Sequence, residues 1–392
     1  MTATAAAETL RDQFLLDPDV VFLNHGSYGA CPKPVFDRYQ WWQRELERQP
    51  VDFLGRRSDD LLDAARAEVA AYVGADADDL VFVTNATSGL NVIARSLPLG
   101  PGDEILTTDH EYGALNLTWE HVCAKTGARY VHHPIPLPVT TAEELVASFW
   151  SRVTPRTKAI FLSHITSVTA LILPVAEICR RAREAGILTI VDGAHVPGQI
   201  PLDLGALGAD IYAGNCHKWL CAPKGSAFLY VRPEHQSAVE ALVVSWGWAR
   251  RPGFVGRNQW QGTRDIAAFL ATPDAIAFQA EHDWPAVRAR CHDLATEVRD
   301  RICARFALPP VQPAGPGWYA QMVVAPLPVP PGDEAVALQR RLYDRHRIEV
   351  PLTRHDDQAM VRVSVQGYNT AEELDLLVDA LGEELPGHTE AH

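Results

Sequence analysis

Residues 187–218 read ILTIVDGAHVPGQIPLDLGALGADIYAGNCHK, and this stretch decides the fold. It begins with an apolar run that ends at Asp192, and a second apolar run ends shortly before Lys218. Runs that are apolar throughout are typical of strands covered on both faces, which favours a parallel sheet between helices. Ligands of such sheets bind at the carboxyl ends of the strands, so we expect Asp192 and Lys218 to face one site.

Short apolar runs alternate with longer helical patterns over the middle of the chain, which indicates crossover units and a mostly parallel sheet. The predicted strands are 80–84, 104–108, 158–163, 188–192, 211–213 and 226–231. The alternation of strands and helices ends at about residue 272, after which a long helical pattern over 273–305 precedes shorter strands and helices. We therefore predict an α/β protein with an N-terminal arm (1–20), a large domain (21–272) and a small C-terminal α+β domain (273–392).

Composition narrows the classes of partner. The chain has 392 residues, of which 47% are hydrophobic and 21% charged, as in globular proteins. Its formal net charge of −14 argues against nucleic acid or an anionic membrane as the main partner. No secretory signal and no run of about 18 apolar residues is present. The seven cysteines include no C-x-x-C pair, so we expect a reduced, cytoplasmic protein without a cysteine-zinc site, and we predict no metal ligands.

Lys218, Asp192 and His195 together suit a pyridoxal 5′-phosphate (PLP) site. A buried lysine amine has a lowered pKa and attaches the cofactor covalently. A carboxylate such as Asp192 keeps the pyridine nitrogen protonated, so that the ring withdraws electrons, and His195 is placed to bond the ring hydroxyl. Each residue alone has an ordinary explanation, as a helix cap, a surface charge or a structural histidine. Their joint placement after two strands favours the cofactor site.

A phosphate group needs hydrogen-bond donors, and the segment after the first predicted strand supplies them. Thr87 and Ser88 open a helix, whose N-terminal amides favour an anion. Asn215 and His217 are placed to reach the phosphate from the other side. Tyr112 follows another strand end and is placed to cover the ring face.

The chain resembles the class V aminotransferase and cysteine desulfurase superfamily of fold-type I PLP enzymes. Within it, the isopenicillin N epimerases are most similar. The segments that carry the resemblance are 22–29 (FLNHGSYG), 50–53 (PVDF), 109–112 (DHEY), 191–195 (VDGAH), 212–219 (YAGNCHKW), 261–265 (QGTRD) and 361–364 (VRVS). The resemblance implies a mostly parallel seven-stranded sheet, PLP as cofactor, an amino-acid substrate, and a homodimer with shared active sites.

The resemblance also assigns roles. Lys218 holds the cofactor, Asp192 faces the pyridinium, Tyr112 stacks on the ring, and Arg362 grips the substrate's α-carboxylate, a task that suits a guanidinium. The remaining implied cofactor contacts are His195, Thr87, Ser88, Ser167, Asn215, His217 and, toward the neighbouring subunit, Thr263. The implied substrate contacts are Asn24 and His25. Trp246, in the tryptophan-rich loop at 245–248, suits either contact with a bulky substrate or packing at an interface.

The sequence is compatible with several different reactions at the substrate's α-carbon. Lys218 is the natural base on one face, and a second proton from Tyr112 or His25 would give an epimerase of antibiotic biosynthesis. Loss of a β-substituent would give a C–S lyase, and a decarboxylating or deaminating enzyme of the lincosamide-pathway type is a related alternative. Reprotonation on the cofactor would give an aminotransferase, and a non-catalytic binding protein is a further alternative. Residues 347–360 contain no cysteine, which disfavours a persulfide-forming desulfurase.

Overall fold

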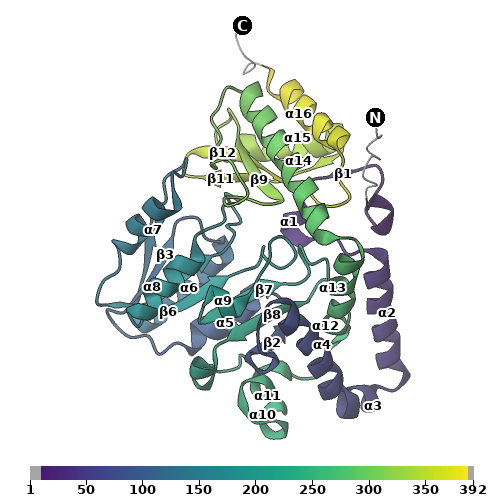
Figure 1. Cartoon of the computed structure of the whole chain (residues 1–392), viewed down its shortest axis with the longest axis vertical. Coiled ribbons are helices and arrows are strands. Elements are labelled where there is room, and N and C mark those ends of the chain that lie inside the picture. Colours follow the sequence, from purple (N-terminus) through teal and green to yellow (C-terminus); the bar gives the residue numbers. More distant parts are fainter. Residues whose placement is uncertain (1–9, 387–392) are drawn as a thin grey trace.

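A seven-stranded sheet forms the centre of the larger domain. In the computed structural model, which describes residues 10–386, its strand order is β2-β8-β7-β6-β5-β3-β4 (Figure 1). The strands are β2 (Leu80–Val83), β3 (Glu104–Thr108), β4 (Arg129–His133), β5 (Thr157–Ser163), β6 (Leu188–Asp192), β7 (Ile211–Asn215) and β8 (Ala227–Val231). Strand β8 runs antiparallel to β7 and β2, and the other pairings are parallel. The predicted mostly parallel, seven-stranded sheet is therefore confirmed.

The sheet is buried on both faces, as the apolar runs predict. In β2, Leu80 and Phe82 pack into one hydrophobic core, while Val81 and Val83 pack into another. Successive side chains of a strand point to opposite faces, so an apolar run supplies both cores at once. Helices α5 and α6 cover one face and α4, α7 and α8 the other.

The helices of the large domain connect and cover these strands. Their bounds are α1 (His25–Tyr28), α2 (Lys33–Arg48), α3 (Pro50–Asp52), α4 (Ser58–Tyr72), α5 (Ala86–Ser96), α6 (Gly113–Thr126), α7 (Ala142–Trp150), α8 (Val175–Glu184), α9 (Leu204–Leu207), α10 (Gly247–Arg250), α11 (Gly253–Gln259), α12 (Ala267–Leu270) and α13 (Thr272–Glu281). Short 3-10 or π turns lie at η1 (Arg11–Gln13), η2 (Phe53–Arg57), η3 (Ala77–Asp79) and η4 (Pro233–Ala238).

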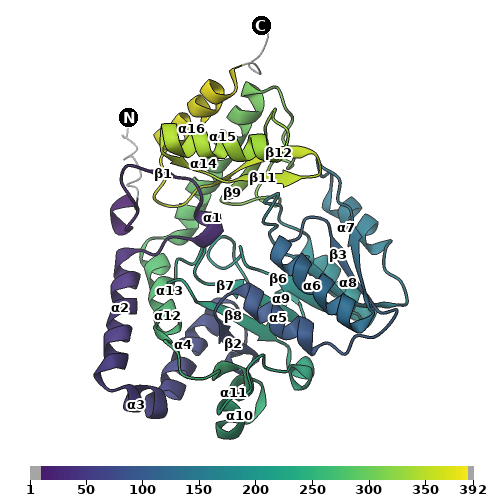
Figure 2. The ribbon, with the colours of Figure 1, turned by 180° about the vertical axis from the view of Figure 1, so that it is seen from behind.

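A smaller α+β unit sits above the carboxyl edge of the large sheet (Figures 1 and 2). Its three-stranded antiparallel sheet has the order β11-β12-β9, with β9 (Met322–Pro326), β11 (Leu352–His355) and β12 (Gln358–Ser364). Three helices pack on it: α14 (Trp284–Arg305), α15 (Asp333–His346) and α16 (Ala371–Glu384). The predicted division at residues 272 and 273 remains a proposal, and part of the predicted N-terminal arm, residues 1–9, lies outside the described residues.

Two details differ from the sequence-based expectations. The single helical pattern predicted over 273–305 is two helices, α13 and α14, separated at Asp283, whose φ of +44° is left-handed and ends α13. The N-terminal strand β1 (Val21–Phe22) pairs in parallel with β10 (Ile348–Glu349), so this early segment joins the small unit although the prediction counts it with the large domain. Leu23 is accordingly buried in the small unit's core.

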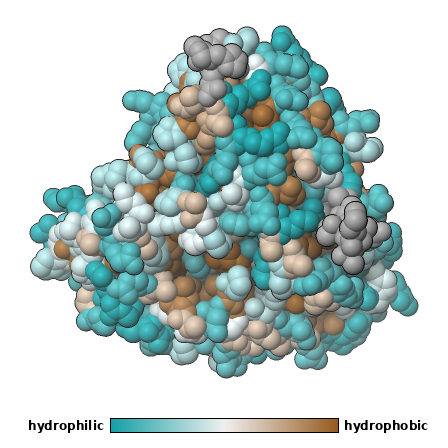
Figure 3. Space-filling model, turned by 45° about the horizontal axis from the view of Figure 1, so that its top comes forward, coloured by the Kyte–Doolittle hydropathy of each residue, from teal (hydrophilic) through white to brown (hydrophobic). Residues whose placement is uncertain are grey.

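The surface seen in Figure 3 is largely hydrophilic, with hydrophobic residues gathered in its lower half. No helix within residues 10–386 has both the length and the apolar character needed to cross a membrane. All seven cysteines are unpaired thiols, and the cytoplasmic location stays a prediction.

Candidate active site

A cavity of about 770 Å³ opens at the carboxyl ends of β3, β6 and β7, within the range of small-molecule sites. Sequence reasoning placed Asp192 and Lys218 at one site, and the structure brings them together there. The predicted site residues that line this cavity are Thr87, Ser88, Tyr112, Ser167, Asp192, His195, Asn215, His217 and Lys218.

The Lys218 amine is held by His195. The distance between Nζ of Lys218 and Nε2 of His195 is 3.3 Å, and Nδ1 of His195 accepts a hydrogen bond of 3.2 Å from the Trp219 indole. Burial holds the pKa of His195 well below its usual value, so its neutral ring carries the proton on Nε2 and donates it to the amine. Burial, helped by the charge of Arg362, lowers the pKa of Lys218 to about 7. A neutral, nucleophilic amine is therefore abundant near neutral pH.

Asp192 ends β6 at the bottom of the cavity. One carboxylate oxygen accepts the backbone N–H of Ala194 at 2.9 Å. Burial raises the pKa of Asp192 to about 6, against the opposing effects of this hydrogen bond and of the Lys218 charge. A cation that faced this carboxylate would favour its ionised form, as a protonated pyridine nitrogen would.

The N-terminus of α5 forms an anion site. Asn85 caps the helix by accepting the Ser88 N–H at 2.7 Å, and the Asn215 side chain accepts the Ala86 N–H at 2.8 Å. Thr87 and Ser88, in the first turn of this helix, both line the cavity. Capping fixes the first turn, so that its remaining amides, its hydroxyls and the helix dipole present a preformed set of donors to a phosphate group.

Arg362, on β12, lies behind the cavity wall and is only 5% exposed. Its Nη1 donates to the carbonyl and hydroxyl oxygens of Ser167, at 2.7 and 3.1 Å, and its Nη2 donates to the Ser27 hydroxyl at 2.9 Å. Both serines line the cavity. Among residues 10–386 no carboxylate forms an ion pair with Arg362, and its Nε has no hydrogen-bond partner. Buried charges are normally paired, so this guanidinium is available to a ligand carboxylate.

His25 does not lie where the sequence placed it. The residue is fully buried and absent from the cavity wall, so its predicted contact with substrate and with a transferred proton has no support from this geometry. Its Nε2 lies 3.0 Å from the Lys218 carbonyl oxygen and its Nδ1 lies 3.0 Å from the Tyr368 hydroxyl. Burial lowers its pKa to about 3, so it braces the Lys218 backbone as a neutral ring.

The turn after His25 also packs against the lysine segment. Gly29 has a φ of +73°, and a Cβ at this position would lie 2.1 Å from the His217 carbonyl oxygen. Only glycine fits both constraints.

Besides Arg362 and His25, three predicted residues lie off this chain's cavity. Asn24 acts indirectly, since it accepts the Ser27 hydroxyl at 2.5 Å and donates to Glu349 at 2.9 Å. Trp246 is 69% exposed and does not line this chain's cavity, and its predicted substrate contact stays a prediction. Thr263 is exposed and also outside the cavity, and its predicted role toward a neighbouring subunit stays a prediction.

Sequence reasoning missed four notable residues. Tyr28, Ser27 and Lys224 line the cavity, and Lys224 follows Lys218 by six residues in a segment that gave no recognisable pattern. Glu111 is buried beneath the cavity, where it accepts hydrogen bonds from the Ser163 N–H at 2.8 Å and hydroxyl at 2.6 Å. Burial raises the pKa of Glu111 to about 7.

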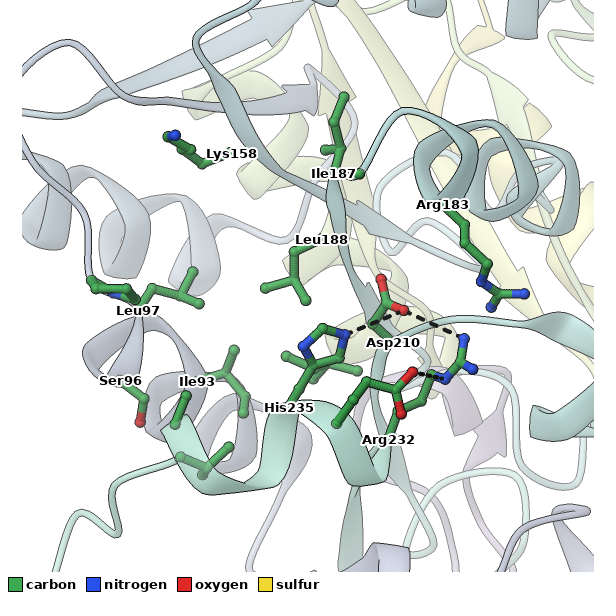
Figure 4. Close-up of a pocket in the computed structure, with 16 residues that line it drawn as sticks. Ile93, Ser96, Leu97, Lys158, Arg183, Ile187, Leu188, Asp210, Arg232 and His235 are labelled. Atoms are coloured by element: carbon green, nitrogen blue, oxygen red, sulfur yellow. Dashed lines mark ion pairs between the residues drawn. The ribbon is translucent and has the colours of Figure 1, made fainter.

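A second hollow, of about 460 Å³, lies at the opposite edge of the sheet (Figure 4). Leu188 and Ile211, at the starts of β6 and β7, help to form it. Its Asp210 is already paired with Arg232 at 3.7 Å and with His235 at 3.6 Å. With its buried charge compensated inside the protein, this hollow offers no group poised for chemistry.

The family described as aminotransferase class-V matches residues 29–314. The chain belongs to that family. It is 40% identical to an isopenicillin N epimerase of Amycolatopsis lactamdurans, over 98% of this chain and 99% of the relative. It is 30% identical to a putative L-cysteine desulfhydrase of rice, over 93% of this chain and 84% of the relative. The solved structure of the Escherichia coli cysteine desulfurase CsdA shares the fold, with a TM-score of 0.79, 24% identity, and coverage of 97% and 98% of the two chains.

These findings settle the class of protein and its cofactor. The class-V chain is an enzyme, and its cofactor is PLP. The residues present fit that group: a lysine with a lowered pKa, a buried carboxylate, and a capped helix N-terminus all line one cavity of suitable volume. The fold expectation and the family resemblance are both confirmed.

Proposed function

We propose that this class-V enzyme is an epimerase that inverts the α-carbon of an amino acid, with a substrate from antibiotic biosynthesis. The observation that carries the proposal is that Arg362, which forms no ion pair within residues 10–386, lies just behind a cavity lined by Lys218 and Tyr112. The 40% identity to an isopenicillin N epimerase over almost the whole length of both chains supports this choice of reaction.

PLP supplies an electron-withdrawing ring that acidifies the substrate's Cα–H bond. The protein supplies the rest. Lys218 would hold the cofactor, Asp192 would face its ring nitrogen, and the first turn of α5 would bind its phosphate. Arg362 would anchor the substrate's α-carboxylate through two parallel N–H donors, which fixes the α-carbon relative to Lys218.

Inversion needs two proton-carrying groups that approach the α-carbon from opposite sides. Lys218 follows β7 and Tyr112 follows β3, and these strands lie on either side of β6, which ends at Asp192. Both side chains line the cavity, and Tyr112 is 44% exposed. We assign proton removal and return on one side to the Lys218 amine, whose pKa of about 7 suits a base near neutral pH. On the other side, Tyr112 carries the proton.

A C–S lyase is the second candidate, because the chain is also 30% identical to a putative L-cysteine desulfhydrase. A lyase needs only one proton-carrying group at the α-carbon, and Lys218 alone would suffice. Persulfide formation on the enzyme has no support, since none of the residues that line the cavity is a cysteine.

The deciding experiment is incubation of the holoenzyme in deuterated water with both enantiomers of a panel of amino acids. The panel includes S-substituted cysteines and amino acids with long side chains. We expect an intact skeleton with one deuterium at the α-carbon and inverted configuration, by mass spectrometry and chiral chromatography. A keto acid with released thiol or ammonia would instead establish the lyase and refute the epimerase.

Tyr112→Phe tests the assignment of the second proton. Removal of the hydroxyl should slow inversion by about 10²–10⁴-fold, the usual contribution of one acid–base group. Exchange of the α-hydrogen with retained configuration should continue, because Lys218 is unaffected. Tyr28→Phe is the matched control, since this tyrosine also lines the cavity and is 75% exposed. Equal losses in the two variants would contradict the role of Tyr112.

We also propose a homodimer with shared active sites. Thr263 is exposed and lies outside its own chain's cavity, as expected if it serves a neighbouring subunit. Light scattering should give twice the chain mass. In mixed dimers, Thr263→Ala chains should be rescued by Lys218→Ala chains, because one of the two sites then keeps both residues, whereas a monomer would show no rescue.

A further inference from the structure

Asp109, His110 and His355 form a cluster outside the active-site cavity. Asp109 and His110 lie in the turn after β3, in the large domain, and His355 is the last residue of β11, in the small unit. One potential ligand atom from each residue lies within 4.8 Å of the others. The cluster therefore joins two segments that are far apart in sequence and belong to the two halves of the molecule.

The Asp109 carboxylate lies between the two imidazoles. Its Oδ1 is 3.6 Å from Nε2 of His110, and its Oδ2 is 3.9 Å from Nε2 of His355. The two rings have centroids 4.0 Å apart. A tetrahedral zinc ion with bonds of about 2.0–2.1 Å holds its ligand atoms about 3.3–3.4 Å apart. One ligand atom from each of the three residues lies within 4.8 Å of the others, so the side chains must draw closer together around an ion.

Nε2 of His355 is a buried polar atom with no hydrogen-bond partner among residues 10–386. The residue is 8% exposed. Buried nitrogen atoms are nearly always partnered, because an unsatisfied one costs about 1–3 kcal/mol. This nitrogen faces Asp109 from outside hydrogen-bond range, at a distance that leaves room for an ion between them.

The surroundings of His110 orient it as a metal ligand. Its Nδ1 lies 2.7 Å from the Thr169 hydroxyl, which in turn lies 2.8 Å from the Thr166 hydroxyl. Without an ion, Nε2 donates to the Ile135 carbonyl at 2.8 Å and Nδ1 accepts from Thr169. Metal binding therefore requires the proton to move to Nδ1, where Thr169 would accept it, and such a bond is typical of metal-binding histidines. Metal binding exchanges the 2.8 Å contact between Nε2 and the Ile135 carbonyl for a metal bond.

We propose that Asp109, His110 and His355 bind one divalent transition-metal ion, for which zinc is the best match. Two imidazoles and one carboxylate suit zinc and disfavour calcium or magnesium, which prefer all-oxygen sites. A fourth position is open to water or to Asp356, whose Oδ2 lies 3.8 Å from Nε2 of His355. Asp109 is partly exposed, so an ion can enter from solvent.

The role of this ion is structural. Tyr112 lies three residues after Asp109, and β11 is hydrogen-bonded to β12, which carries Arg362. A metal bond between the β3 turn and the end of β11 therefore fixes the positions of two active-site residues relative to each other. It also ties the small unit to the large domain.

The test uses the holoenzyme after dialysis against a chelator. Zinc chloride is titrated calorimetrically, and bound metal is counted by mass spectrometry after gel filtration. We expect one zinc per chain and an increase in the thermal unfolding midpoint. His355→Ala and Asp109→Asn should weaken zinc binding by at least about 100-fold and abolish that increase.

The Asp109→Asn variant should keep the fold, because its amide oxygen can still accept the hydrogen bond from the Ile135 N–H that Asp109 accepts at 2.9 Å. Its loss of zinc binding would therefore not be caused by misfolding. His235→Ala is the control, since this half-buried histidine also pairs with an aspartate but lies at the opposite edge of the sheet (Figure 4). It should bind zinc as the unaltered protein does. The proposal fails if the unaltered enzyme binds less than about a tenth of an equivalent, or if His355→Ala still binds one zinc.

Discussion

Replacement of Arg362 by leucine tests how the substrate is held. The guanidinium is buried, forms no ion pair within residues 10–386, and keeps its two terminal nitrogens bonded only to Ser27 and Ser167. A hydrogen bond to a charged group contributes about 1.5–3 kcal/mol. Loss of two such bonds to a substrate carboxylate should therefore lower kcat/KM by about 10²–10⁴-fold. Arg362→Lys keeps the charge without the planar fork and should recover only part of this loss.

The assay compares an amino acid with the corresponding amine that lacks the α-carboxylate. Binding of the amine, followed by the change in cofactor absorbance, should be nearly the same in the parent enzyme and in Arg362→Leu. In the cofactor-free protein the variant should also raise the pKa of Lys218, because the Arg362 charge helps to depress it. The reasoning is refuted if the variant loses less than about threefold in kcat/KM, or if amino acid and amine lose equally.

Two further variants probe the cofactor site and the buried histidines. Asn215→Ala removes the acceptor of the Ala86 N–H and leaves that buried donor unpaired. PLP should therefore dissociate faster, by about tenfold or more, in a chase experiment followed by absorbance. An unchanged rate would exclude a role of Asn215 in holding the phosphate site. Burial lowers the pKa of His164 to about 4, so its contribution to stability is complete above about pH 6.5 and is lost as the pH falls toward 4. His164→Gln should therefore reduce the slope of the unfolding free energy against pH by up to about 1.4 kcal/mol per pH unit between pH 6.5 and 4, as measured by urea titrations. An unaltered slope would contradict the lowered pKa of His164.

The strands that build the site could be predicted because their apolar runs are local signals. β3 and β6 were predicted with their observed bounds, and Asp192 and Lys218 followed from the position of strand ends. β4 was missed, because this edge strand (Arg129–His133) is half exposed and has no apolar run. The break between α13 and α14 carried a signal that was not used, since Pro285 stands in the first turn of α14.

The side chains that were misplaced depend on contacts between distant segments. His25 lies beside true site residues in sequence, but Tyr368 and the Lys218 carbonyl turn it into the interior. No local sequence pattern predicts these two long-range contacts of His25. Ser27 and Lys224 have no spacing that distinguishes them from surface residues, and only the folded chain brings them to the cavity. Trp246 is aromatic and near other tryptophans, which suggested a substrate contact, yet it lies exposed beside α10.

The pairing of β1 with β10 has a consequence for how the protein is made. Val21 leaves the ribosome more than three hundred residues before its partner Ile348 is synthesised. At roughly 5–20 residues per second, the first strand waits from about a quarter of a minute to about a minute without a partner. During that time the turn that will brace the lysine segment is also unsupported. The support of the lysine segment is therefore complete only after Ile348 has been synthesised, and interrupted translation before that residue should leave a chain that binds its cofactor poorly.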